Sequence, residues 1–234
     1  MKNVIACKNC QQENPLYNFI CLKCNSYLRE RIVNIDLWST IGLLIESPSK
    51  AFKNIIHAEH KNFIFFLYFL VSIKFFINTL ILAEPVFGNS GIFGYLSITF
   101  MVSLVAPLVL FFLFSWLFTM LTKAFHVKTR FKDNLSIIIY SQFPHIIGLV
   151  FLFPVEMVLF GAFLFTSNPS PFILKPGPAL IISILELLMM LWSAILIFFA
   201  IKVTSKSVIY SIIVTLLLSL FINGIFLLSA ALIR

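Results

Sequence analysis

Four cysteines stand in two pairs near the amino terminus and are the only cysteines in the chain. Two residues separate Cys7 from Cys10 and Cys21 from Cys24, and ten residues separate the pairs. Two such pairs can place four thiolates around one point, which is the closed tetrahedral coordination of structural zinc. An iron ion in the same sulfur set and two disulfides are the alternatives. Closed coordination leaves no open position for a substrate, so the spacing predicts a structural metal.

The cysteine pattern resembles the short zinc ribbons of prokaryotic membrane and regulatory proteins. Those modules tend to carry glycine after the second cysteine of each pair, where this chain has Gln11 and Asn25. Asparagine tolerates a left-handed backbone there better than glutamine does. A module this small lacks a core of its own, so we expect residues 1–30 to fold only with metal bound.

Three charged side chains, Lys74, Glu156 and Glu186, lie inside long apolar stretches. Charges inside membrane spans are rare and mark paired or functional groups. At ~1.5 Å rise per residue, each lies about 12–15 Å from the outer end of its span, so the three can share one layer. We expect Lys74 to pair with Glu186 or Glu156, which would fix the order of the spans or form a polar site for an ion or lipid headgroup. A lysine that extends to the headgroups without a partner is the alternative.

No constellation in the sequence predicts catalysis. Ser90 in the segment 88–91 and His145 superficially resemble the nucleophile and base of rhomboid proteases. Their predicted depths put them about 20 Å apart, whereas proton transfer needs about 3 Å. His145, next to Pro144, is better interpreted as a hydrogen-bonding partner for carbonyls that the proline leaves free. No phosphate loop or zincin helix occurs, so we expect a protein that is not an enzyme.

The composition requires a lipid environment for most of these residues. Of 234 residues, 60% are hydrophobic and 11% are charged, whereas soluble domains carry roughly 25% charged residues. The net charge of +8 comes from basic residues spread along loops, which favours a role in membrane topology over nucleic-acid binding. No cleavable signal peptide is recognisable, so the first span is expected to direct its own insertion.

The apolar stretches predict five crossings. The central one, from Asn134 to Thr166, contains Pro144 and Pro154 and would extend about 50 Å as one straight helix. A second piece starting at Pro154 would reach only about 20 Å, so we interpret the stretch as one long crossing kinked near the prolines. A turn at Glu84 and Pro85 is expected to end the first crossing. The other four predicted crossings are Asn62–Ala83, Phe93–Leu121, Ala179–Ile201 and Val208–Leu232.

Residues 31–61 are expected to form two short amphipathic helices. Apolar residues recur at helical spacing from Asp36, a capping residue, to Glu46. Ser47 and Pro48 then form a second cap and first turn. Trp38 and the neighbouring lysines suit the depth of the lipid headgroups. Packing of both helices on the transmembrane bundle is equally compatible with the pattern.

Basic residues orient the crossings. With five crossings, 14 of the 17 Lys and Arg residues fall on the side of the amino terminus and two on the other. The positive-inside rule therefore places the amino terminus in the cytosol and the carboxyl terminus outside. Six crossings give the same distribution, so length rather than charge favours five. A reducing cytosol favours bound metal over disulfides.

Several sequence features together resemble the Yip (Ypt-interacting protein) family of membrane proteins. They are Pro48 before Ala51-Phe52, the segment Tyr140-Ser141-Gln142-Phe143-Pro144 after a basic loop, and Trp192 in the fourth crossing. The resemblance covers roughly Leu44 to the carboxyl end and leaves the ribbon as an added module, as in prokaryotic members. The resemblance implies a non-enzymatic protein of a prokaryotic plasma membrane. Eukaryotic relatives are associated with small GTPases, so it also implies a protein partner, for which a small GTPase is one candidate class.

The sequence therefore predicts an all-α membrane protein, a five-span helical bundle over residues 62–234 with a small amino-terminal zinc-ribbon module. We expect it to act as an interaction or membrane-organising component. The alternative function is a small transporter or channel that uses Lys74, Glu156 and Glu186.

Overall fold

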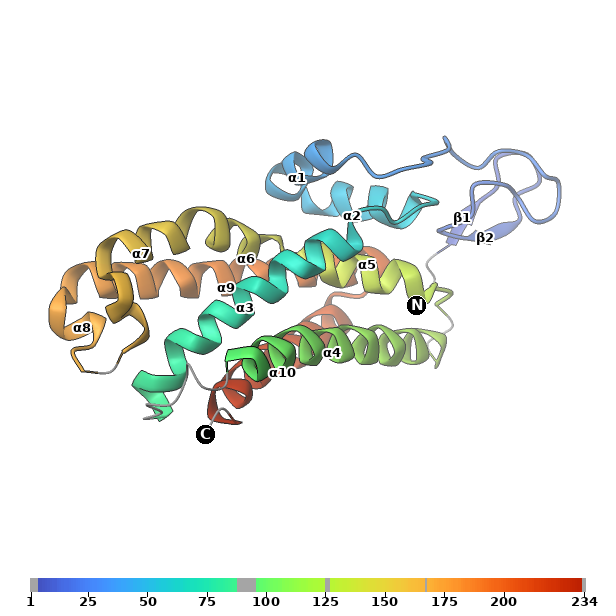
Figure 1. Ribbon diagram of the computed structural model, residues 1–234. Helices are drawn as coiled ribbons and strands as arrows, with labels where there is room; N and C mark the ends of the chain where they lie inside the picture. Colours follow the sequence, from blue (N-terminus) through green and yellow to red (C-terminus); the bar gives the residue numbers. More distant parts are fainter. Residues whose placement is uncertain (1–3, 88–95, 125–126, 167, 233–234) are drawn as a thin grey trace. The chain divides into compact units, whose positions relative to one another are not determined.

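The computed structural model describes residues 4–87, 96–124, 127–166 and 168–232, and these are mostly helical (Figure 1). By contacts the chain forms two compact units. The first unit comprises Met1–Phe65, Phe111–Ser141 and Ile195–Leu216, and the second comprises Phe66–Leu110, Gln142–Ala194 and Leu217–Arg234.

The first unit begins with a two-stranded antiparallel sheet, β1 (Val4–Ala6) and β2 (Glu13–Pro15), which pairs Ile5 with Asn14. The sheet lies in the segment predicted as a zinc ribbon. Two helices follow, α1 (Leu37–Glu46) and α2 (Pro48–His57). Asp36 caps α1 as predicted, since its carboxylate accepts a hydrogen bond from Ser39 N at 3.2 Å.

The two short helices differ in how far their apolar residues are buried. Ala51, Phe52 and Ile55 of α2 are fully buried, and α2 packs on α5 (Phe131–Ser141) within the first unit. Packing on protein, the alternative to lipid contact, therefore holds for α2. Helix α1 buries Leu44, but Trp38 remains 80% exposed.

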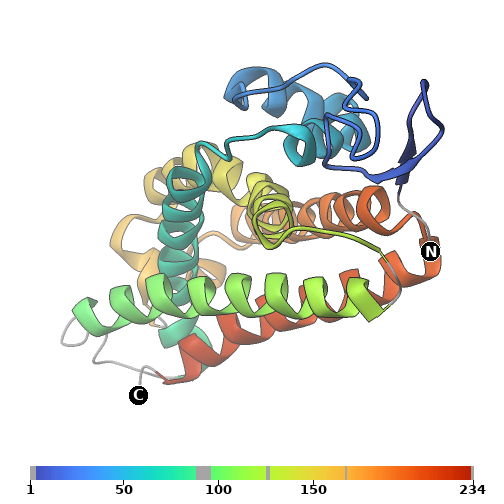
Figure 2. The same cartoon turned by 90° about the vertical axis from the view of Figure 1, so that its right-hand side faces the viewer.

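Four helices are long and apolar enough to cross a membrane among the residues that the structure describes. Three of these are α3 (Ile64–Phe87), α4 (Leu96–Ala124) and α9 (Pro176–Ser205); the fourth is the continuous helical run Phe143–Phe165. The last helix, α10 (Val208–Leu232), begins and ends at the predicted residues. In the first unit, the later part of α4 and the first part of α10 run side by side (Figures 1 and 2), and the rings of Phe118 and Tyr210 lie 6.2 Å apart.

The turn predicted at Glu84 and Pro85 is absent, because α3 continues to Phe87. A proline near the end of a helix removes one backbone hydrogen bond without requiring the helix to stop there. The predicted turn was therefore wrong, although the apolar span Ile64–Leu82 ends within one residue of the predicted crossing.

The predicted central crossing starts later than expected. Helix α5 ends at Ser141, and a new helix, α6 (Phe143–Ile147), begins at Phe143. Asn134 to Ser141 are all buried in α5 and do not belong to the apolar run that is long enough to span, which is Phe143–Phe165. Pro144 lies in the first turn of α6, where its missing N–H is not needed, so it starts a helix instead of kinking one.

A wider helical turn accommodates the second proline. Gly148–Leu152 form a π-helical turn, α7 (Phe153–Phe160) then starts with Pro154 in its first turn, and a 3-10 turn, Gly161–Phe165, completes the run. Gly161 has a φ of 55°, a left-handed backbone that glycine adopts without strain. Within the second unit, Leu152, Phe160 and Leu164 pack against Ala179 and Ile182 of α9. The short helix α8 (Pro171–Leu174) lies at the end of this pair of segments (Figure 1).

Candidate functional site

The two cysteine pairs form matching loops in the first unit. Cys7 N donates to Gln12 O at 3.0 Å, and Cys7 O accepts from Gln11 N at 2.9 Å. Cys21 repeats both bonds with Ser26 O and Asn25 N, at 2.9 and 3.1 Å. Gln11 and Asn25 have φ values of 56° and 53°. Both positions that carry glycine in similar ribbons are therefore left-handed here.

The four sulfurs fit one metal ion. All lie within 4.8 Å of one another, and the pairs Cys7–Cys24 and Cys10–Cys21 are each 3.5 Å apart. A disulfide requires about 2.05 Å between sulfurs. Tetrahedral zinc with bonds of about 2.3 Å places its thiolates about 3.8 Å apart. The geometry thus suits a bound metal and describes reduced cysteines.

Hydrogen bonds around Cys7 and Cys21 favour the thiolate form that binds metal. The pKa of Cys10 instead rises to about 12, because its backbone hydrogen bond at Gln12 is outweighed by burial and by the neighbouring cysteines. The Ser26 hydroxyl lies 3.1 Å from Cys7 Sγ and, together with nearby backbone N–H groups, lowers the pKa of Cys7 to about 6. Backbone N–H groups of Cys24 and Lys23 lower the pKa of Cys21. Thiolates are the metal-binding form, so these donors prepare the site.

Asn14 supports the site and was missed by the sequence analysis. Its side chain is fully buried, donates to Gln12 O at 2.8 Å, and accepts from Leu22 N at 2.9 Å. The amide also lies 3.6 Å from Cys21 Sγ. An asparagine before proline indicates a turn, so nothing in the sequence alone marked this residue as a bridge between the two cysteine loops.

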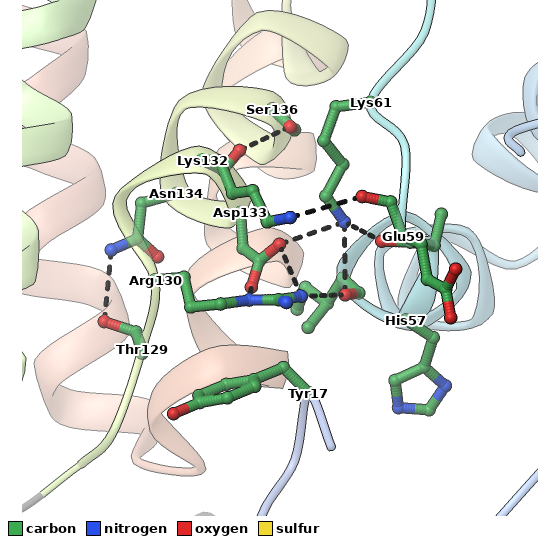
Figure 3. Close-up of polar contacts among 12 residues, drawn as sticks. Tyr17, His57, Glu59, Lys61, Thr129, Arg130, Lys132, Asp133, Asn134 and Ser136 are labelled. Atoms are coloured by element: carbon green, nitrogen blue, oxygen red, sulfur yellow. Dashed lines mark hydrogen bonds and ion pairs between the residues drawn. The ribbon is translucent and has the colours of Figure 1, made fainter. Parts of the chain in front are cut away.

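A buried ionic cluster joins the helices next to the ribbon, and we call Lys61, Arg130 and Asp133 the junction cluster (Figure 3). Lys61 Nζ lies 2.9 Å from Asp133 Oδ1, and Arg130 Nε lies 2.7 Å from Asp133 Oδ2. The Lys61 and Asp133 side chains are only 5% and 4% exposed. One buried carboxylate therefore pairs with a buried ammonium and with a guanidinium that is 30% exposed.

Lys61 also closes the end of α2. Its ammonium donates to Ile56 O at 3.1 Å and Ala58 O at 2.8 Å, and also to Ile55 O. These carbonyls lie at the negative end of the helix dipole. Burial lowers the pKa of Lys61 to about 8 although Asp133 acts in the opposite direction, so the ammonium remains mostly charged at neutral pH.

The ribbon is attached to this cluster through Tyr17. The Arg130 guanidinium lies 4.5 Å from the centre of the Tyr17 ring, a cation–π contact (Figure 3). Arg29 Nη2 donates at 3.1 Å to both Tyr17 O and His57 O. The ribbon, α2 and α5 are thus linked within the first unit. From the sequence alone, Arg130 and the other basic residues are expected only to orient the crossings.

In the second unit, Lys74 of α3 pairs with Glu186 of α9. Lys74 Nζ lies 2.5 Å from Glu186 Oε1, and Asn78 Nδ2 donates to Glu186 Oε2 at 3.4 Å. The Lys74 side chain is fully buried. Gly148 makes room for it, because a Cβ at that position would lie 3.2 Å from Lys74 Cε. Of the two partners left open by the sequence, the structure pairs Lys74 with Glu186.

Glu156 stands apart from that pair. Its side chain is 3% exposed, and Oε2 has no hydrogen-bond partner among the described residues. Glu156, Asn78 and Glu186 line one cavity of about 340 Å³ whose other walls are mostly apolar. The cavity was not predicted, because its walls come from α3, α7, α8 and α9 and carry no local sequence signal.

The remaining candidate residues are His145 and Ser90. His145 is buried and packs edge-on against Phe75 with ring centres 5.4 Å apart. Its Nδ1 has no partner in the described part of the chain, so the hydrogen bond expected for this residue is not seen at that atom. Ser90 lies outside the described residues.

A protein-family model matches most of the chain. The family model of the Yip1 domain matches residues 41–231. No curated protein and no solved structure matches the chain. The family match covers the four spanning helices and agrees with their apolar character. The chain therefore belongs to the Yip1 domain family and is an integral membrane protein.

Proposed function

We propose that this protein is a non-enzymatic interaction or membrane-organising component whose ribbon presents a fixed surface at the membrane. The observation that carries the proposal is the attachment of the ribbon to α2 and to the residues around α5. Tyr17 is held by Arg130 and Arg29, and Asp133 holds Arg130 and Lys61. A ribbon joined to the helices only by a flexible linker would not require a buried ionic cluster, whereas a ribbon held in one orientation would.

The metal in this proposal is zinc, bound by Cys7, Cys10, Cys21 and Cys24. Four thiolates with no open position suit zinc in a structural role. Bound metal would hold together the two cysteine loops, which have little core of their own. The ribbon would therefore present its surface only in the metal-bound form.

The topology in this proposal has five crossings, with α10 as the fifth. Its 25 residues would extend about 37 Å, enough for a hydrocarbon core of about 30 Å. The amino terminus and the ribbon would lie in the cytosol of a prokaryotic cell and the carboxyl terminus outside, because basic residues favour the cytosolic side. Residues 31–61 would lie at the membrane surface, with Trp38 of α1 at headgroup depth.

The partner in this proposal is a protein, with small GTPases as the class that the family suggests. Cross-linking in the native membrane, followed by recovery of the full-length protein, would identify it. Cys10→Ser should abolish recovery of that partner while insertion remains intact, because loss of one thiolate releases the metal. Lys8→Ser, an exposed change in the same loop, is the matched control. Unchanged partner recovery by metal-free Cys10→Ser protein would refute a role for the ribbon.

A small transporter or channel is the second candidate, favoured by the cavity beside Lys74 and Glu186. Protein reconstituted in liposomes should then carry an ion or solute flux. Neutralising the pair with Lys74→Met or Glu186→Gln should stop that flux, provided that the variants insert at normal levels. Absence of flux from wild-type liposomes for inorganic cations and for amines would exclude this candidate.

A further inference from the structure

The cavity in the second unit has a few polar groups in an otherwise apolar lining. Asn78, Glu156 and Glu186 supply the polar groups, together with the Ser183 hydroxyl. Its volume of about 340 Å³ is within the usual range for small-ligand sites, roughly 300–1,000 Å³. The remaining lining residues are apolar, and they include Phe160, Leu164, Ile182 and Met190. The lining therefore suits a molecule with a small polar group and a hydrocarbon part.

The charged groups at the cavity do not balance. Lys74 lies beside the cavity rather than in its lining, and its contact with Glu186 at 2.5 Å neutralises that carboxylate. Asn78 adds a donor to the same group. Oε2 of Glu156 is buried and has no hydrogen-bond partner among the described residues, and Lys74 acts on this carboxyl only at longer range. A buried carboxylate in this position costs several kcal/mol, and this cost is avoided when the group takes up a proton or when a cation is brought to it.

We propose that the cavity binds a lipophilic primary amine, with its ammonium at Glu156 and its hydrocarbon chain along the walls formed by α7 and α9. A protonated amine supplies both the missing positive charge and N–H donors for the free oxygen. Apolar burial of the chain provides the remaining binding energy. An anionic headgroup is disfavoured, because the site has two carboxyl groups and a single ammonium already paired with one of them.

The proposal deepens the second candidate function and uses the same cavity, but it does not require transport. Binding without flux would exclude the transporter and leave the amine site intact. Two sources of the amine share this chemistry: the aminoethyl headgroup of a bilayer phospholipid and a free long-chain amine. The test therefore includes a separate arm for each source.

Native mass spectrometry of the full-length protein released from detergent micelles provides the measurement. Dodecylamine should bind the wild type with one molecule per chain, at least tenfold more tightly than either of two control compounds. Dodecanol lacks the positive charge, and dodecyltrimethylammonium carries the charge but has no N–H donor. Glu156→Gln should remove this preference. In the lipid arm, retention of phosphatidylethanolamine over phosphatidylcholine in the wild type alone would identify the headgroup as the source.

Two wall variants test the location. Ile182→Trp fills the cavity and should abolish binding of dodecylamine, whereas Ile181→Trp, next to it and 60% exposed, should leave binding unchanged. Equal thermal unfolding of the two variants would show that the loss is not a loss of fold. Should Ile182→Trp unfold, Glu156→Gln alone decides. Equal affinity of the wild type for the amine and the alcohol, or unchanged amine binding in Glu156→Gln, would overturn the proposal.

Discussion

Asp133 is the side chain that keeps the charges near the ribbon compatible with burial. It contacts both Lys61 and Arg130, and its side chain is 4% exposed. Asp133→Asn leaves two cations without a counter-charge, so the free energy of unfolding should fall by about 3 kcal/mol. Denaturant titration of the purified protein in detergent would measure this loss.

The matched control is Glu59→Gln, which removes the carboxylate of the more exposed Arg31–Glu59 pair at 2.9 Å. Exposed pairs contribute less than about 1 kcal/mol. Equal losses for the Asp133 and Glu59 variants would show that the junction cluster contributes no more than a surface pair.

Gln11 and Asn25 share a left-handed backbone but should respond differently to glycine. Gln11→Gly removes a strain of about 1 kcal/mol and should strengthen zinc binding in competition with a chelator by about fivefold. Asn25→Gly should change affinity less, because asparagine already tolerates this conformation. Gln12→Gly is the control and should weaken binding. No gain from Gln11→Gly would mean that backbone strain does not limit the ribbon.

His57 should make the first unit sensitive to acid. Burial, with help from Arg29, lowers the pKa of His57 to about 4, below its ordinary value of 6.5. The folded state therefore binds fewer protons than the unfolded state between these values, so stability is lost as pH falls from about 6.5 to 4. After allowance for partial solvation, the loss is about 1–2 kcal/mol.

Comparison of variants separates His57 from other titrating groups. His57→Gln should flatten the pH dependence of the unfolding free energy between pH 6.5 and 4, whereas replacement of the exposed His60 by Gln should not. Parallel curves for wild type and His57→Gln would contradict the assignment.

Among the elements, the run from α6 to α7 depends on a close approach at Gly148. The π-helical turn places this residue beside Lys74, and an added Cβ would lie 3.2 Å from Lys74 Cε. Gly148→Ala should cost about 1 kcal/mol of unfolding free energy, because Lys74 is held by Glu186 and cannot easily move.

Gly42 in α1 provides the control for that change. A Cβ there meets nothing within 4 Å, so Gly42→Ala should stabilise the protein by about 0.5–1 kcal/mol through helix propensity alone. A stabilising effect of the same size at Gly148 would show that the space beside Lys74 is adaptable.

At the scale of the whole molecule, the number of crossings decides where the two ends lie. Five crossings place them on opposite faces of the membrane, because an odd number reverses the side. Reporter domains that are active only in the cytosol or only outside it, fused separately to each end, should report cytosol for the amino terminus and the outer face for the carboxyl terminus. Reporters that place both ends on one face would require an even number of crossings.

The sequence by itself determined the features that depend on local chemistry. Cysteine spacing selected the four sulfurs, Asp36 and Pro48 marked helix starts, and apolar length indicated the spanning helices. Capping and hydrophobic length act within one segment, so they can be identified without knowing what lies next to it. The same rules misplaced the start of the central crossing. Contact with protein and contact with lipid both favour apolar residues, and α5 is buried in protein.

Only the tertiary structure decided which partners these segments bring together. Lys74 meets Glu186 across 112 positions of sequence, Asp133 meets Lys61, and Tyr17 lies against Arg130. In each contact, the separation of the two residues along the chain follows neither a helical nor a strand repeat. Each charged residue also had several oppositely charged groups available. Packing chose among them because a buried charge is stable only where the surrounding helices place its partner within hydrogen-bond distance.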